Sequence, residues 1–238
     1  MATIRFGVTT DTQDLTGRVL STAAVPALSR ERLAAATGPF VGRIRQVPPM
    51  FSALHHQGRR LYELAREGVE VEREPRDVVV HAIVVEDVTE ATATLRIVCG
   101  RGTYVRTLAA DLGAVLGCGG ALERLVRTRV GAFDREGAVT ADEIAAATPE
   151  ILWARVLPPE AAVGHLRRVR LDAVAAAAFV HGQAIDLPRP ADPTEGFVRV
   201  HDDSGLMLGV GTLGAGGRQL KPSRILHADH PGTRVLPV

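Results

Sequence analysis

The chain has 238 residues, 46% of them hydrophobic, and a formal net charge of +1 at pH 7. This length and composition suffice for a buried core in one or two globular domains. The near-zero net charge excludes a polycation, so nucleic-acid binding cannot be inferred from total charge. Lys221 is the only lysine. We attribute the excess of arginine chiefly to genome composition, although guanidinium groups also suit phosphate contacts and base stacking.

Targeting and redox signals are weak in this sequence. It has no run of about 18 apolar residues, and its start lacks the basic, apolar and small-residue order of a signal peptide. We therefore expect a cytoplasmic protein with no membrane partner. Two cysteines, Cys99 and Cys118, are too few for a disulfide framework or a metal site, so we expect ordinary thiols and no metal.

The first predicted element is a half-buried strand, because apolar and polar residues alternate over residues 2 to 8. A turn over residues 9 to 14 follows. Ser29 is the expected N-cap of a short helix that runs through Ala36 and ends at Gly38.

The middle of the chain predicts two neighbouring strands and a helix. Residues 76 to 85 are nearly all β-branched where they are apolar, which predicts a central strand covered on both faces. Residues 91 to 98 are its expected neighbour. Thr103 is the expected N-cap of a helix over 103 to 117, and a second, short helix is expected near 121 to 126.

Proline-rich sequence then marks a predicted domain boundary. Thr140 and Glu143 form a capping-box pattern, and Pro149, Pro158 and Pro159 flank Trp153. We predict a first domain of mixed α+β class over residues 1 to 150 and a small, β-rich second domain over residues 151 to 238.

The second domain is predicted to hold one helix and three strands. The helix runs from Asp172 to Val180 and ends at Gly182, and a hairpin turn is expected at 203 to 205. The strands are expected at residues 196 to 200, 206 to 210 and 220 to 226.

The most informative segment, Cys99–Gly113, reads CGRGTYVRTLAADLG. It predicts a buried strand, a glycine turn and a helix start, with Tyr104 and Arg106 at the corner. An aromatic ring beside a guanidinium at a helix start suits a flat ring and an anion, such as a nucleobase and its phosphate. Alternatively, the turn is ordinary chain reversal, Tyr104 is a half-buried packing residue and Arg106 is a solvated charge.

Four further segments accompany this one, in the order GVTTDTQD (7–14), QVPPMFSAL (46–54), GRRLYELAREG (58–68) and LVRTRVG (125–131). Together with TADE (140–143), the chain from about Ala2 to about Ile144 resembles the TruB family of tRNA pseudouridine synthases. The resemblance implies a mixed β-sheet catalytic core and isomerisation of uridine 55 in the tRNA T loop. It also implies no cofactor, the tRNA T stem-loop as partner, and a monomer.

The resemblance also implies roles for individual residues. Tyr104 would lie against the flipped uracil, and Arg106 would pair with the nucleophilic aspartate. Leu125 would line the apolar wall of the pocket, unless it is a core leucine. Asp11 and Asp14 lie in a turn near the active site in this family, although turn aspartates that bond their own backbone would look the same.

Residues 48 to 68 match the RNA-contacting loop and helix of the family. The expected RNA-binding residues are His55, His56, Gln57, Arg59, Arg60, Tyr62 and Arg66. A plain surface helix packed through Leu61, Leu64 and Ala65 is the alternative. Residues 206 to 211 and 220 to 224 more weakly resemble a PUA-like RNA-binding module, for which a glycine-rich β module without partner preference is the alternative.

Two family segments are missing from these 238 residues. The nucleophilic aspartate of the family lies in a Gly-x-Leu-Asp-Pro-x-Ala-x-Gly segment upstream of the point that matches Met1, and a Lys-x-Tyr segment lies just before the first strand. Neither segment occurs here. The only Asp-Pro pair, Asp192-Pro193, has different flanks. We therefore expect a catalytic domain incomplete at its N-terminus, through a misassigned start or a true truncation, and no activity from this chain alone. The alternatives are a non-catalytic RNA-binding remnant and a poorly folded fragment.

Overall fold

The computed structural model describes residues 1–188 and 195–226, and Asp192-Pro193 lies outside this described part. The chain divides into two compact units, Met1–Thr128 and Arg129–Val238, which are described separately. Among the described residues, no helix is both long enough and apolar enough to cross a lipid bilayer.

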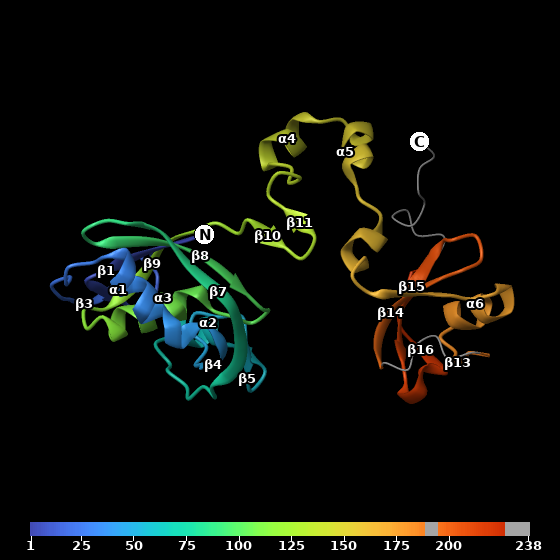
Figure 1. The fold of residues 1–238 in the computed structure, drawn as a ribbon, viewed down its shortest axis with the longest axis horizontal. Helices are drawn as coiled ribbons and strands as arrows, with labels where there is room; N and C mark the ends of the chain where they lie inside the picture. The colour runs from blue at the N-terminus through green and yellow to red at the C-terminus, as the bar shows by residue number, and fades with distance from the viewer. Residues whose placement is uncertain (189–194, 227–238) are drawn as a thin grey trace. The chain divides into compact units, whose positions relative to one another are not determined.

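The first unit is built on a five-stranded antiparallel sheet (Figure 1). Its strands, in spatial order, are β4 (Gly42–Gln46), β7 (Arg76–Val88), β8 (Thr92–Cys99), β1 (Ala2–Phe6) and β9 (Gly120–Leu125). The predicted strands at 2 to 8, 76 to 85 and 91 to 98 are confirmed, although the first is shorter than predicted.

β1 shows the alternation that its sequence predicts. Ala2, Ile4 and Phe6 are buried, whereas Thr3 and Arg5 are half-buried. The strand lies between β8 and β9, with Ala2 opposite both Leu95 and Leu125. It ends at Gly7, whose φ of 82° is a conformation that glycine adopts without strain.

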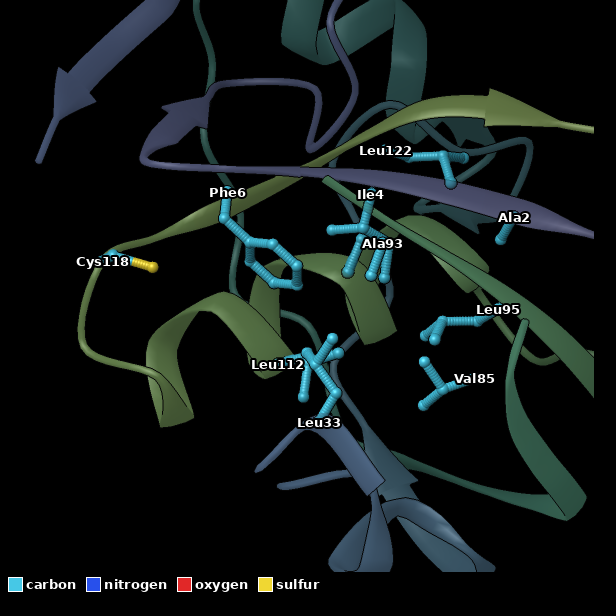
Figure 2. Close-up of a cluster of buried hydrophobic side chains, with 11 residues drawn as sticks. Ala2, Ile4, Phe6, Leu33, Val85, Ala93, Leu95, Leu112, Cys118 and Leu122 are labelled. Atoms are coloured by element: carbon cyan, nitrogen blue, oxygen red, sulfur yellow. The ribbon is translucent and has the colours of Figure 1, made fainter. Parts of the chain in front are cut away.

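Two helices cover one face of this sheet, α1 (Arg30–Thr37) and α3 (Val105–Val115). Ser29 caps α1 by accepting a hydrogen bond from the Arg32 amide, as predicted. Figure 2 shows Leu33 of α1 and Leu112 of α3 directed at the side chains of the sheet. The buried members of this core are Ala2, Ile4, Phe6, Leu33, Val85, Ala93, Leu95, Ala109, Leu112, Cys118 and Leu122.

Three predictions for the first unit are wrong. Residues 121 to 126 do not form a helix but lie largely in β9, because pairing with β1 outweighs a weak local preference for helix. β7 is not covered on both faces: Val79 and Val84 are 37% and 39% exposed, since α1 and α3 pack on the opposite face. Thr103 does not cap α3, and the N-cap residue is Tyr104.

The remaining elements of the first unit are short. They are β2 (Val8–Thr10), β3 (Val19–Thr22), a 3₁₀ turn η1 (Gly38–Phe40), β5 (His55–His56), β6 (Arg59–Arg60) and α2 (Leu61–Arg66). β2 pairs with β3, and β5 pairs with β6. The first pair flanks the turn that carries Asp11 and Asp14.

The second unit contains another five-stranded sheet. In spatial order its strands are β12 (Arg167–Arg170), β14 (Gly196–His201), β15 (Met207–Leu213), β16 (Gln219–Ile225) and β13 (Ile185–Asp186). β12 is parallel to β14, and the other pairs are antiparallel. The three strands predicted in this region are confirmed, with β15 longer than predicted.

One helix, α6 (Ala173–Val180), packs on this second sheet. Asp172 caps it by accepting a hydrogen bond from the Ala175 amide, and Phe179 is fully buried. The core joins Ala176 and Phe179 of the helix to apolar side chains of the strands. The predicted helix is therefore confirmed.

Residues 129 to 163 are part of the second unit and form short helices and strands. These are β10 (Arg129–Val130), β11 (Phe133–Asp134), α4 (Ala141–Ala146), α5 (Pro149–Arg155) and a 3₁₀ turn η2 (Pro159–Val163). The capping box of Thr140 and Glu143 is present at the start of α4, as predicted.

Candidate active site

The candidate site is the corner between β8 and α3. Gly102, with a φ of 82°, turns the chain after β8, and Tyr104 then stands as the N-cap of α3 without a side-chain cap of its own. This position places Tyr104 and Arg106 within the same helix start, as the sequence predicts.

Gln46 anchors the backbone of the N-cap residue. Its side-chain Oε1 accepts a hydrogen bond from the Tyr104 amide at 3.0 Å, and its Nε2 donates to the Tyr104 carbonyl oxygen at 3.2 Å. The residue is only 2% exposed. A buried amide that bonds both backbone groups of one residue fixes that residue more firmly than one hydrogen bond could. The sequence analysis did not single out Gln46, because β4, which ends at this residue, was not predicted.

Arg106 lies at the centre of a polar cluster. Its Nη1 donates to Asp14 Oδ2 at 3.2 Å and to the Thr12 carbonyl oxygen at 3.4 Å, and its Nη2 donates to the Phe51 carbonyl oxygen at 2.7 Å. The Arg106 and Asp14 side chains are 26% and 21% exposed. The structure thus joins the α3 start to two distant segments, the turn at 11 to 16 and the loop after β4.

Asp14 is held ionised by its surroundings. Its Oδ1 accepts hydrogen bonds from the Thr16 hydroxyl at 2.5 Å, the Thr12 hydroxyl at 2.9 Å and the Thr16 amide at 3.0 Å. Burial opposes ionisation, but these hydrogen bonds and the Arg106 charge outweigh it and lower the pKa of Asp14.

Two other aspartates of the first unit, Asp11 and Asp111, are placed differently. Asp11 accepts a hydrogen bond from the Arg18 amide at 2.9 Å, as the turn alternative predicted. Asp111 lies further along α3, where burial raises the pKa of its carboxyl. Only Asp14 is ion-paired with Arg106.

The lowered pKa of Asp14 predicts a pH-dependent contribution to stability. A depressed pKa in the folded state means that the ionised carboxylate stabilises the fold above the ordinary pKa of aspartate. This stabilisation is lost as the pH falls through the lowered value. We expect Asp14→Asn to lower the free energy of unfolding by about 1 kcal/mol near neutral pH, with a smaller difference in acid. Urea unfolding of both proteins across pH measures this, and a difference that grows on acidification would contradict it.

Gln46→Glu is expected to change stability with pH in the opposite sense to the ionised carboxylate of Asp14. In Gln46→Glu the new carboxylate still accepts from the Tyr104 amide, but it faces the Tyr104 carbonyl oxygen without a proton. Burial and this carbonyl would raise its pKa, so stability should be lost as pH rises. We expect a loss of about 1 to 3 kcal/mol at neutral pH, partly recovered in mild acid, where the protonated acid can donate.

Gln46→Met is the matched control for this experiment. Methionine has a similar volume but forms neither hydrogen bond and does not titrate. Its unfolding free energy relative to the wild type should therefore stay constant over the same pH range. If Gln46→Glu and Gln46→Met show the same pH dependence, the two-point contact with Tyr104 does not determine the stability of this corner.

The expected RNA-contacting residues form a hairpin followed by a helix. His55 pairs with Arg60, and His56 pairs with Arg59. The two turn residues, Gln57 and Gly58, have φ values of 49° and 84°, as a tight two-residue hairpin requires.

Tyr62 lies between two arginines on α2. The Arg60 and Arg66 guanidinium carbons are 5.9 and 5.4 Å from the centre of its ring. Arg59 forms an ion pair with Glu67 at 2.5 Å. Leu61 and Leu64 are buried, whereas Arg59, Arg60 and Arg66 are exposed. The segment thus packs through its apolar side and presents its arginines to solvent, so the two interpretations of it are compatible.

Leu125 lies at the end of β9 and is 49% exposed. It is therefore not a core leucine, and its role in a pocket wall stays a prediction. Cys99 and Cys118 are free thiols, half-buried and buried.

The chain matches three family models. Residues 1–105 match the N-terminal domain of the TruB family of pseudouridylate synthases. Residues 106–163 match the C-terminal domain of tRNA pseudouridylate synthase B, and residues 168–226 match the C-terminal region of pseudouridine synthase II TruB.

Curated relatives agree with these models. The chain is 42% identical over 228 residues to a tRNA pseudouridine synthase B of Aromatoleum aromaticum, covering 94% of this chain and 71% of that protein. It is 44% identical over 229 residues to a tRNA pseudouridine synthase B of Burkholderia mallei, covering 94% of this chain and 75% of that protein.

Solved structures show the same fold at lower identity. A Cbf5-Nop10-Gar1 complex matches with a TM-score of 0.67 and 19% identity, over 94% of this chain. An H/ACA RNP bound to a substrate RNA containing 2'-deoxyuridine matches with a TM-score of 0.64 and 19% identity, over 96% of this chain. The chain spans 64% and 65% of those two chains.

The α+β fold predicted from the sequence is thus shared with these two solved structures. The family models together match more than half of the chain, and relatives above 40% identity cover most of it. The chain belongs to the TruB family of tRNA pseudouridine synthases, which are isomerases.

Proposed function

We propose that this protein isomerises uridine 55 in the T loop of tRNA to pseudouridine. The observation that supports this most is the polar cluster at the start of α3, where the catalytic candidate Tyr104 is the N-cap residue and Arg106, two residues on, is ion-paired with Asp14. A fixed cation can orient a carboxylate, and an aromatic ring two residues away can orient a flat base. This arrangement suits a reaction that brings a carboxylate and a base together.

The reaction breaks the bond between C1′ of the ribose and N1 of uracil and forms a bond from C1′ to C5. The C5 proton is lost and N1 gains one, so substrate and product have the same composition and no cofactor is consumed. The base must leave the stack before the enzyme can reach it, at a cost of a few kcal/mol.

Each site residue has a role in this proposal. Tyr104 stacks on the extruded uracil, worth about 1 to 3 kcal/mol, and its hydroxyl assists proton transfer. Where the nucleophilic aspartate motif is present, Arg106 pairs with that aspartate as well as with Asp14 and keeps it ionised by an opposite charge at short range. Leu125 contributes apolar wall to the pocket, and Asp11 and Asp14 support the turn beside it.

RNA binding is assigned to the hairpin and helix of residues 55 to 66. The exposed arginines there offer charge to phosphates, and Tyr62 offers a ring face. We further propose a catalytic domain extending to about residue 150 and a PUA-like RNA-binding domain beyond it, in a monomer that acts in the cytoplasm.

The nucleophilic aspartate motif does not occur within these 238 residues. We therefore propose that residues 1–238 bind the T stem-loop without converting it, and that conversion requires the motif. A non-catalytic RNA-binding protein is the alternative, and it predicts that no form of the protein converts uridine.

Two experiments test the proposal. In cells that lack the gene, we expect pseudouridine to disappear at position 55 of tRNA and to persist at other tRNA positions, measured by carbodiimide modification and primer extension. Persistence at position 55 would contradict the assigned substrate.

The second experiment uses the purified 238-residue chain and a T-arm hairpin RNA. We expect saturable binding that weakens steeply with salt, and no conversion of uridine. Conversion by this chain would overturn the requirement for the motif and would direct attention to Asp11, Asp14 and Asp111. An absence of binding would contradict the tRNA partner.

A further inference from the structure

Gln46 combines deep burial with a polar side chain. It ends the edge strand β4 and is 2% exposed, whereas the other four residues of β4 are exposed or half-buried. A buried amide is costly unless its oxygen and its nitrogen are both hydrogen-bonded. Here both atoms bond one residue, Tyr104, so this contact offsets the cost of burying an amide at a strand end.

Little else fixes the Tyr104 backbone before α3 begins. Gly102, two residues earlier, has a φ of 82° and open space where a Cβ would lie. Thr103 has a buried hydroxyl without a hydrogen-bond partner in the described part of the chain. The Tyr104 carbonyl oxygen also accepts from the Leu108 amide at 3.1 Å, within the first turn of the helix. The Tyr104 amide, by contrast, is held by Gln46.

The Tyr104 ring takes its direction from this backbone. Within the described residues, the Tyr104 side chain forms no hydrogen bond and no cation-π contact, and the residue is half-buried. The backbone sets the direction of the bond from Cα to Cβ, and two side-chain torsions then place the ring. The orientation of the Tyr104 peptide groups therefore limits where the ring can lie.

Arg106 is fixed by different partners. Its guanidinium is bonded to the Asp14 carboxylate and to the Phe51 carbonyl oxygen, neither of which involves Gln46. Loss of the Gln46 contact should therefore displace the Tyr104 ring relative to the Arg106 cation.

We propose that Gln46 is a positioning residue for the isomerisation: by holding the Tyr104 backbone at two points, it directs the Tyr104 ring at the extruded uracil. This inference rests on the proposed function, because that function supplies the uracil. A base stacks on the face of a ring, and a small displacement of a positioning group lowers the rate of a reaction strongly. Gln46 acts through Tyr104 and is not itself a catalytic residue.

Amide hydrogen exchange measured by NMR tests the contact in Gln46→Met, which preserves volume but removes both hydrogen bonds. We expect the Tyr104 amide to exchange at least about tenfold faster, because its acceptor is gone. The Leu108 amide keeps its helical acceptor and should change by no more than about twofold.

Fluorine NMR tests the consequence for the base. The probe is a T-arm hairpin RNA with 5-fluorouridine at position 55, bound to the 238-residue chain, in which the aspartate motif does not occur, so binding is observed without chemistry. A nucleus over an aromatic ring is shielded by the ring current, so the wild type should shift the fluorine signal upfield. Tyr104→Leu should abolish this shift and thus identify its source.

Gln46→Met should reduce the upfield shift at least about twofold, because the ring no longer lies flat against the base. The Kd of the hairpin should change by no more than about threefold, because phosphate contacts elsewhere supply most of the affinity. Gln46→Glu is the second variant. It keeps the acceptor for the Tyr104 amide and loses the donor, so it should give an intermediate shift.

Val85→Ala is the control for a general loss of stability. Val85 is 5% exposed and belongs to the core of the same unit, so its truncation destabilises the unit, while no hydrogen bond joins it to Tyr104. All variants are compared at a temperature at which circular dichroism shows them folded. Val85→Ala should keep the wild-type fluorine shift and the slow exchange of the Tyr104 amide. An equal loss of shift in Val85→Ala and Gln46→Met would overturn the inference.

The remaining outcomes separate this inference from the proposed function. If the wild type shows the shift and Gln46→Met retains it in full, Gln46 does not position the ring, and the proposed function stands. If the hairpin binds but Tyr104→Leu leaves the shift unchanged, the ring does not stack on the base and the role of Gln46 is overturned. If the hairpin does not bind at all, the proposed function fails and this inference fails with it.

Discussion

Gly113→Ala is expected to destabilise the first unit by at least about 2 kcal/mol. Gly113 lies on α3 where the helix meets the chain entering β9, and an added Cβ would lie 2.1 Å from the Gly120 nitrogen and 2.2 Å from the Gly119 carbonyl carbon. Alanine is favoured over glycine within a helix by about 1 kcal/mol. Overpacking typically costs about 1 to 3 kcal/mol and occasionally more. Here the added Cβ meets backbone, which must move, so the clash outweighs the helix preference and the net effect is destabilising.

Gly38→Ala is the control for this substitution. Gly38 has a φ of −49°, and an added Cβ would meet nothing within 4 Å. The unfolding free energy should change by no more than about 0.5 kcal/mol. Urea unfolding by circular dichroism, with hydrogen exchange to locate the effect in Met1–Thr128, measures both variants. Equal stability of Gly113→Ala and wild type would show that α3 can shift away from β9 at little cost.

Phe179→Ala is expected to remove about 3 to 5 kcal/mol from the stability of the second unit. The ring is fully buried, and it packs so closely over β15 that a Cβ on Gly211 would lie 3.3 Å from its Cε2. The absence of a side chain at Gly211 therefore makes room for the Phe179 ring. Alanine at position 179 would leave a cavity in the centre of this core.

Val174→Ala on the same helix is the control, because Val174 is 82% exposed. Its effect should stay within about 0.5 kcal/mol. The two hydrophobic cores are separate sets of residues, so Phe179→Ala should leave hydrogen exchange in residues 1 to 128 unchanged. Accelerated exchange there would show that the units do not unfold independently.

Much of the fold could be predicted because local signals and tertiary packing agree. Alternation in β1, the Ser29 cap of α1 and the Asp172 cap of α6 are each satisfied in the structure. Where the two disagree, packing wins. Residues 121 to 126 are compatible with a helix by composition, but they lie next to β1 and complete its hydrogen bonding as β9.

The candidate site was predicted in part. Tyr104 and Arg106 could be placed at a strand-to-helix corner from the glycines before them, and Asp14 from the resemblance. The contact of Gln46 with Tyr104 spans 58 positions of sequence, and no local pattern specifies a partner at that distance. The buried Thr103 hydroxyl, which has no hydrogen-bond partner among the described residues, shows that a good capping residue does not cap when another contact sets the helix start.

The position of β1 within its sheet affects how the first unit can be synthesised. β1 is made before both of its neighbours, since Ala2 pairs with Leu95 and Leu125. At roughly 5 to 20 residues per second, the ribosome needs roughly 6 to 25 seconds to reach β9. Until β8 is made β1 has neither partner, and until β9 follows one of its edges stays unpaired and can pair with other chains. The unit must therefore fold late in its translation, and conditions that slow elongation should favour aggregation of the nascent chain over folding.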